Sequence, residues 1–104
     1  MTSTTAAAAG CAADAGFEAF EARARADGYT EVLVREWAPG QVVGEHAHPF
    51  ALRVHLARGE LVLTCNGQAR RLRAGDAFEL ALQAPHAEAY GPEGATYWAA
   101  RRNT

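Results

Sequence analysis

The chain has no lysine, no isoleucine and no long apolar run. A membrane-spanning helix needs about 18 consecutive apolar residues, and no segment approaches that length, so we expect no membrane partner. All ten basic residues are arginine, and twelve acidic residues outnumber them to give a formal net charge of −2. A nucleic-acid binder carries a clustered excess of basic charge, so we expect no nucleic-acid partner. Abundant alanine, arginine and glycine without lysine favour a GC-rich bacterial source.

Cysteine is also scarce, because only Cys11 and Cys65 are present. The first lies in an alanine-rich segment and the second in a predicted strand, so they form neither a disulfide framework nor a paired metal motif. The run Ala6 to Ala9 lacks the preceding basic residues of a secretory signal. We therefore expect a reducing, cytoplasmic location.

The length of 104 residues fits one domain. Alanine supplies 25 of the hydrophobic residues, so the residues able to form a core are few. We expect a disordered tail over residues 1–13 and a single domain over residues 14–104.

A short helix is predicted over residues 14–26. Phe17 and Phe20 recur at helical spacing, Asp14 is a plausible N-cap, and Gly28 is a plausible stop. The phenylalanine face is expected to pack against the outside of the next element rather than to bind a cofactor.

Short alternating runs separated by glycine, proline and asparagine follow Tyr29, and they predict an all-β fold. Asn66-Gly67 is the strongest hairpin signal, because a type I′ turn requires positive φ at both positions. A compact barrel or jelly roll over residues 30–102 fits these runs. The expected strands are 30–37, 41–43, 50–57, 60–65, 68–73, 77–82, 86–90 and 95–101.

His46 and His48 are separated by one residue, and this spacing points both side chains to one face only if the backbone is extended. Gly40 and Pro49 argue against a helix there. His86, on a distant predicted strand, can join them. Imidazole is the commonest ligand for transition metals in proteins, so the three histidines are candidate metal ligands.

The spacing of these residues resembles the two sequence motifs of the cupin superfamily, over roughly residues 30 to 102. The first motif matches at Gly40, His46, His48 and Gly59, and the second at Gly75 and His86, while Ala81, Gln83 and Tyr90 stand where the second motif usually has Pro, Gly and Asn. The resemblance implies a small single-domain cupin, a jelly-roll β-barrel with one short N-terminal helix. It also implies that His46, His48 and His86 hold a divalent transition metal such as Zn, Ni, Fe or Mn.

The chain departs from the family at the acidic metal ligand. Counting back from Gly59 places Leu52 there, or Arg53 in the alternative register. Leu52 is expected to face inward, whereas Arg53 and His55 should face outward. His55 is then a surface or subunit-interface residue. The fourth ligand position is vacant, filled by water or supplied from elsewhere; alternatively, the fold remains and the metal has been lost.

Glu88 shares the expected inward face with His86 and Tyr90, because the three alternate along one strand. It is a candidate catalytic residue that moves a proton in the pocket. Two other roles fit the same position. Glu88 replaces the missing metal ligand, or it accepts a hydrogen bond that orients an imidazole. The plainer interpretation is an exposed carboxylate at the rim.

Two functions fit these features. The first is a metal-dependent cupin acting on a small organic molecule; the second is a non-catalytic ligand-binding or sensing cupin with a degenerate or empty metal site. Fold alone does not choose between them. Because a small barrel with open sheet edges must protect those edges, we also expect a homodimer.

Overall fold

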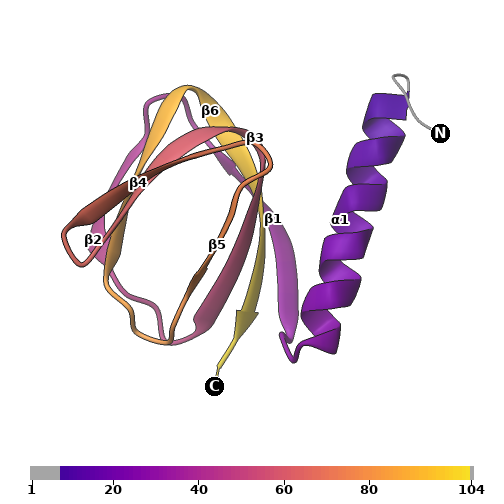
Figure 1. Ribbon diagram of the computed structural model, residues 1–104, viewed down its shortest axis with the longest axis horizontal. Coiled ribbons are helices and arrows are strands. Elements are labelled where there is room, and N and C mark those ends of the chain that lie inside the picture. The colour runs from indigo at the N-terminus through magenta and orange to yellow at the C-terminus, as the bar shows by residue number, and fades with distance from the viewer. Residues whose placement is uncertain (1–7, 104) are drawn as a thin grey trace.

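The structure is a computed structural model that describes residues 8–103, with side chains from residue 16 onward. A ring of strands stands beside a single helix (Figure 1). The elements in the described range are α1 (Ala8–Ala26), β1 (Glu31–Trp37), β2 (Val42–His46), β3 (Ala51–Cys65), β4 (Gln68–Arg73), β5 (Ala77–Leu80) and β6 (His86–Arg102). The predicted all-β class with one helix is confirmed. The first seven residues of the predicted tail lie outside the described residues.

Two long strands, β3 and β6, run through the whole molecule and organise it into two sheets. The first part of β3 pairs with the second part of β6, and β1 and β5 flank them. The second part of β3 pairs with the first part of β6, and β2 and β4 flank those parts. All pairings are antiparallel. The two sheets face each other, and the core and the site lie between them.

Both β3 and β6 bend and continue where the sequence predicted that one strand ends and another begins. Residues 50–57 and 60–65 were predicted as separate strands, but β3 continues through Gly59, and β6 likewise joins 86–90 to 95–101. The pairing register shifts around Gly59, whose φ is 84°. A Cβ atom there would overlap the carbonyl oxygen of Gly94. Glycine therefore bends the strand without ending it.

The helix begins earlier than predicted. It starts at Ala8 rather than at residue 14, so Asp14 lies within it and the N-cap assignment is wrong. Alanine has the highest helix propensity of all residues, and the alanine-rich segment continues the helix toward the N-terminus. The predicted stop is confirmed, because the helix ends at Ala26 and Gly28 follows with a φ of 99°. None of the described helical residues forms a segment long and apolar enough to cross a membrane.

The helix packs on the outer face of the barrel. Phe17 and Phe20 contact Trp98 of β6, with ring centroids 5.8 and 5.9 Å apart. The predicted packing role of this phenylalanine face is confirmed. The helix thus covers the outside of the sheet and leaves the interior to the site.

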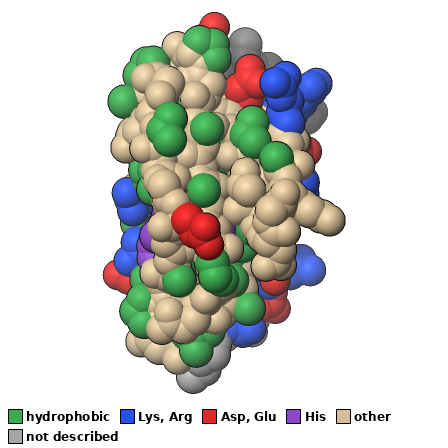
Figure 2. All heavy atoms as spheres, turned by 90° about the vertical axis from the view of Figure 1, so that its left-hand side faces the viewer, with side chains coloured by type: hydrophobic (Ala, Val, Ile, Leu, Met, Phe, Trp, Pro, Cys, Tyr) green, Lys and Arg blue, Asp and Glu red, His purple; other side chains and the backbone are tan. Residues whose placement is uncertain are grey.

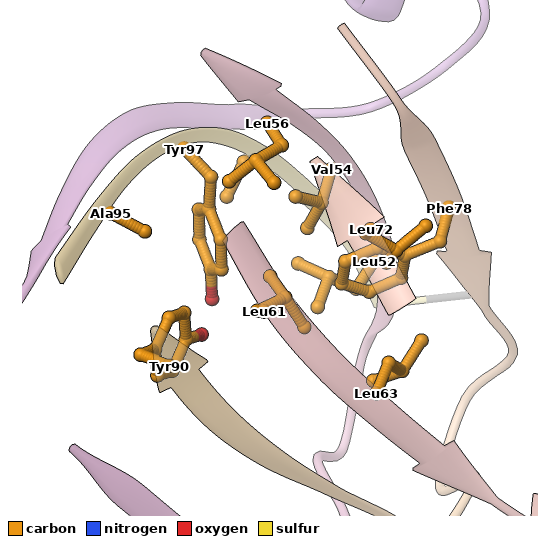
Figure 3. Packing of buried hydrophobic residues seen from close by; sticks show 11 residues of the cluster. Leu52, Val54, Leu56, Leu61, Leu63, Leu72, Phe78, Tyr90, Ala95 and Tyr97 are labelled. Atoms are coloured by element: carbon orange, nitrogen blue, oxygen red, sulfur yellow. The ribbon is translucent and has the colours of Figure 1, made fainter. Parts of the chain in front are cut away.

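The hydrophobic core lies between the two sheets, and Figure 3 shows its packing. Leucines and aromatic residues from the inward positions of β3, β4, β5 and β6 form it. The hydroxyl groups of Tyr90 and Tyr97 point toward one another in this view. The buried members include Leu52, Val54, Leu56, Leu61, Leu63, Leu72, Phe78, Tyr90 and Tyr97.

The hairpin between β3 and β4 has the predicted turn. Asn66 and Gly67 both adopt positive φ, at 54° and 76°, and the flanking residues Cys65 and Gln68 are paired. These are the features of a type I′ turn. The sequence signal at Asn66-Gly67 is therefore confirmed.

Candidate metal centre

Three histidines from two segments distant in sequence converge in the barrel. His46 is the last residue of β2 and pairs directly with His86, the first residue of β6. His48 follows in the loop after β2. Each ring offers a nitrogen that lies within 4.8 Å of those from the other two. The predicted convergence of these side chains is confirmed, and it results from the pairing of β2 with β6.

Backbone carbonyls fix the orientation of two of the rings. His46 Nδ1 lies 2.7 Å from the carbonyl oxygen of Gly44, and His86 Nδ1 lies 3.0 Å from that of Ala84. A carbonyl only accepts, so each Nδ1 carries the proton and donates it. Each Nε2 then keeps its lone pair for the interior. A metal-binding histidine is usually oriented in this way by an acceptor at its other nitrogen.

The loop that carries His48 is tied to the segment preceding His86. The backbone N–H of Gln83 donates to the carbonyl oxygen of His48 over 2.8 Å. Gln83 has a φ of 63°, in the left-handed region that favours glycine. It stands where the second cupin motif usually has glycine, and the chain keeps that backbone conformation despite the side chain. The two histidine-bearing segments are thus held in register.

Burial and neighbouring charge keep His48 neutral. Desolvation is the largest cause that lowers the pKa of His48, and the positive forms of His46 and His86 and the guanidinium of Arg101 lower it further. Only a neutral imidazole can ligate a metal. The electrostatics of the site therefore favour the ligating form of this side chain.

Glu88 is a buried carboxylate beside the histidines. Its side chain is 3% exposed, and one of its oxygens lies 3.2 Å from His86 Nε2. The other oxygen accepts a hydrogen bond from the Tyr90 hydroxyl. Burial and the adjacent Glu88 carboxylate raise the pKa of Tyr90, so the tyrosine keeps its proton and remains a donor. The interpretation of Glu88 as an exposed rim carboxylate is wrong.

The contact between His86 and Glu88 calls for a positive charge. His86 Nε2 is buried without a hydrogen-bond partner among the described residues, and it faces a carboxylate oxygen at 3.2 Å. With its proton on Nδ1, the ring presents a lone pair to another acceptor. A divalent cation on Nε2 removes this conflict, and imidazole nitrogens suit Zn, Ni, Fe or Mn. The donor set therefore fits a transition metal. Glu88 itself is not among the groups whose ligand atoms lie mutually within 4.8 Å.

Leu52 occupies the expected position of the acidic ligand. It is 4% exposed and lines the same cavity as His46 and His48. Arg53 faces outward, where it forms ion pairs with Asp27 and Glu79 at 2.8 and 3.0 Å. The predicted register of this strand is confirmed, and neither residue can supply a carboxylate.

His55, the fourth histidine, lies on the other face of β3. Its ring stacks on Trp98 with centroids 4.8 Å apart and planes at 17°, and Phe20 of the helix packs over it. The predicted outward direction is confirmed. The helix of the same chain covers only part of His55, which is half-buried and lies apart from the metal centre.

The centre opens into a cavity of about 310 Å³ between the two sheets. Histidine atoms are visible at one edge of the face shown in Figure 2. His46 and His48 are both partly exposed, so the centre is accessible from solvent. The cavity contains two arginines that the sequence analysis did not single out. The only available signal was their alternation with inward apolar residues. The lining is formed by Arg35, Trp37, Gln41, Val43, His46, His48, Phe50, Leu52, Glu88, Tyr97, Ala99 and Arg101.

The bent two-sheet barrel and the histidine pattern define a small cupin domain. The family model of the AraC-like ligand-binding domain matches residues 28–100. The chain therefore belongs to the family of AraC-like ligand-binding domains. No curated protein matches it.

Solved structures share this fold. An RmlC-like cupin from Shewanella frigidimarina is 22% identical with a TM-score of 0.60, and the alignment covers 71% of this chain and 68% of that one. KdgF from Halomonas sp. is also 22% identical, with a TM-score of 0.59 and coverage of 68% and 67%. The DMSP lyase DddQ from Ruegeria pomeroyi is 24% identical with a TM-score of 0.63 and coverage of 68% and 36%. This chain thus spans little more than a third of that lyase.

Proposed function

We propose that the protein is a metal-dependent cupin that binds a small organic molecule in its cavity and acts on it. His46, His48 and His86 are the metal ligands. The observation that supports this most strongly is the convergence of three ring nitrogens, one of them buried and without a hydrogen-bond partner among the described groups. The family of ligand-binding domains, and neighbours that include a lyase, agree with a small-molecule ligand.

Each residue of the centre has a distinct role in this proposal. A bound divalent metal supplies a Lewis acid with positions open to the ligand. Glu88 lines the cavity and accepts or returns a proton of the bound molecule. Tyr90 donates to one oxygen of Glu88 and leaves the other directed toward the centre. Leu52 and the aromatic residues exclude water from the inner end.

A second candidate function is ligand binding or sensing without turnover. The match to a ligand-binding family favours it. So does the apolar Leu52 at the acidic ligand position, which leaves the histidines as the only mutually close ligand group among the described residues. In this version the histidine centre is degenerate or empty. His86 then carries a second proton and forms an ion pair with Glu88.

Replacing Glu88 by glutamine separates the two versions. In the metal-binding version, the amide donates to the lone pair of His86 Nε2, so we expect the metal-free protein to gain about 1 kcal/mol. The metal-dependent rise in melting temperature should shrink, because the carboxylate no longer offsets the cation's charge. Thermal denaturation in EDTA and in zinc measures both effects. Glu18→Gln, an exposed change on α1 at a residue with no ion pair among the described residues, is the control.

The opposite outcome supports the metal-free version. In that outcome, Glu88→Gln lowers the melting temperature in EDTA, and zinc raises the melting temperature of neither the parent nor the variant. Glu88 then pairs with an imidazolium, and the metal assignment is wrong. The reason is that glutamine cannot replace the charge in a buried ion pair.

We also propose a homodimer. The two sheets end at strands β1, β5, β2 and β4, each paired on one side only within the described chain. Open edges of this kind favour pairing between subunits. Sedimentation velocity at micromolar concentration should give twice the mass of 11.1 kDa. A single species at the monomer mass would contradict this.

A further inference from the structure

We propose that the cavity selects small organic carboxylates and that Arg35 and Arg101 bind the carboxylate group. This inference names the substrate class and therefore rests on the function proposed above. It derives from the charge of the cavity wall and from donors that lack acceptors.

Both arginines come from the inward face of the first sheet. Arg35 of β1 is paired in register with Tyr97 of β6. Arg101 is an even number of residues further along β6, so its side chain lies on the same face as that of Tyr97. The cavity is lined by both guanidinium-bearing side chains. Glu88 is the single acidic residue among the described lining residues, and its oxygens are directed to Tyr90 and His86. The wall is therefore positively charged even before a metal is added.

Aromatic rings hold the two guanidinium groups in place. The Cζ atom of Arg35 lies 4.6 Å from the ring centre of Trp37, and that of Arg101 lies 4.7 Å from the ring centre of Phe50. Stacking restrains a guanidinium plane while leaving its N–H edges available to a planar anion. Arg35 has no ion pair among the described residues, and Arg101 has one exposed contact, to Glu31 at 3.4 Å.

Two N–H groups of the cavity wall are buried without an acceptor. They are Nε of Arg101 and Nε1 of Trp37, and both side chains line the cavity. A buried donor left unpaired costs about 1 to 3 kcal/mol. A carboxylate offers two acceptor oxygens in the geometry that arginine matches best. The cavity wall therefore carries more donors than the described residues supply with acceptors, and a carboxylate is the anion that suits an arginine in this wall.

The arginines and the histidines line the same cavity. Arg35 and Arg101 border it together with His46 and His48. A ligand whose carboxylate lies at the arginines can therefore present a second group to the histidines. A cavity of about 310 Å³ is at the small end for ligand sites, which favours a compact acid over a nucleotide.

Dicarboxylates of increasing length are suitable probes. We expect malonate, succinate and glutarate to raise the melting temperature of the protein, with one length preferred, because one end must meet the arginines and the other the histidines. The half-amide succinamate keeps the size of succinate and removes one charge, and it should bind at least tenfold more weakly. Inorganic phosphate tests whether any anion suffices.

Variants of the two lining arginines test whether the dicarboxylates bind in the cavity. Arg101→Gln and Arg35→Gln should each weaken dicarboxylate binding at least tenfold by calorimetry, and Arg101→Lys should recover only part of the loss. Arg71→Gln, an exposed change of equal charge on β4, should leave binding unchanged. Equal binding by all of these variants, or phosphate binding as tightly as the best dicarboxylate, would overturn the inference.

Measurements on zinc-loaded and metal-free protein separate this inference from the proposed function. Zinc binding with no arginine-dependent carboxylate binding refutes the carboxylate inference alone. Arginine-dependent binding in a protein that binds no metal refutes the metal function alone and supports the carboxylate site.

Discussion

Replacing His86 with alanine should reduce metal affinity by about a hundredfold or more. Zinc sites with four protein ligands bind with about 10 to 16 kcal/mol, so each ligand contributes about 3 kcal/mol, and about 1.4 kcal/mol corresponds to a factor of ten. His86 contributes the most buried of the three rings, with 1% of its side chain exposed. Water cannot readily take its place there. Calorimetric titration of the metal-free protein with zinc measures the change.

His55→Ala is the matched control for this experiment. It removes the same kind of side chain from the outer face of the barrel, where the ring stacks on Trp98. It should lower the stability modestly through lost packing and leave the zinc affinity within twofold of the parent. If His55→Ala and His86→Ala weaken zinc binding equally, the metal is bound outside the centre described above.

Replacing Leu52 with glutamate should produce the second large effect, a change in thermal stability whose direction depends on whether metal is bound. Without metal, the variant loses the burial of one leucine, about 1.5 to 3 kcal/mol, and also buries an unpaired charge. With metal, the new carboxylate lies on the inward face beside the histidines and adds a charged oxygen ligand. The metal-dependent rise in melting temperature should therefore be larger for Leu52→Glu than for the parent.

Leu52→Gln is the control for this variant. It removes the same leucine and adds a side chain of similar length without a charge, so any gain special to glutamate reports coordination. Thermal denaturation in EDTA and in saturating zinc provides the comparison. Equal metal-dependent gains for the parent and Leu52→Glu would show that this position does not reach the metal.

Local patterns in the sequence predicted much of the fold. The turn at Asn66 and Gly67 was predictable because both positions need positive φ, and the end of the helix because Gly28 follows it. The continuity of β3 through Gly59 was not predictable. A glycine that bends a strand and one that ends it look alike in sequence. The distinction arises from the close approach of Gly94 in the folded chain.

The candidate site was likewise predictable from the sequence only in part. The histidine spacing predicted the convergence of His46, His48 and His86, because strand parity is a local property. The inward arginines were missed, since Arg101 belongs to a terminal Arg-Arg pair that resembles an exposed end. Its role in lining the cavity depends on the pairing of β6 with β1. Contacts between strands distant in sequence therefore carry the information that the sequence pattern lacked.

The metal content of the untagged protein tests the central claim most directly. Elemental analysis should find close to one equivalent of Zn, Ni, Fe or Mn per chain in the parent protein and almost none in His86→Ala. The absence of a polyhistidine tag is essential, because a tag binds the same metals. A parent protein that retains no metal after incubation with each of the four ions and dialysis would contradict the claim.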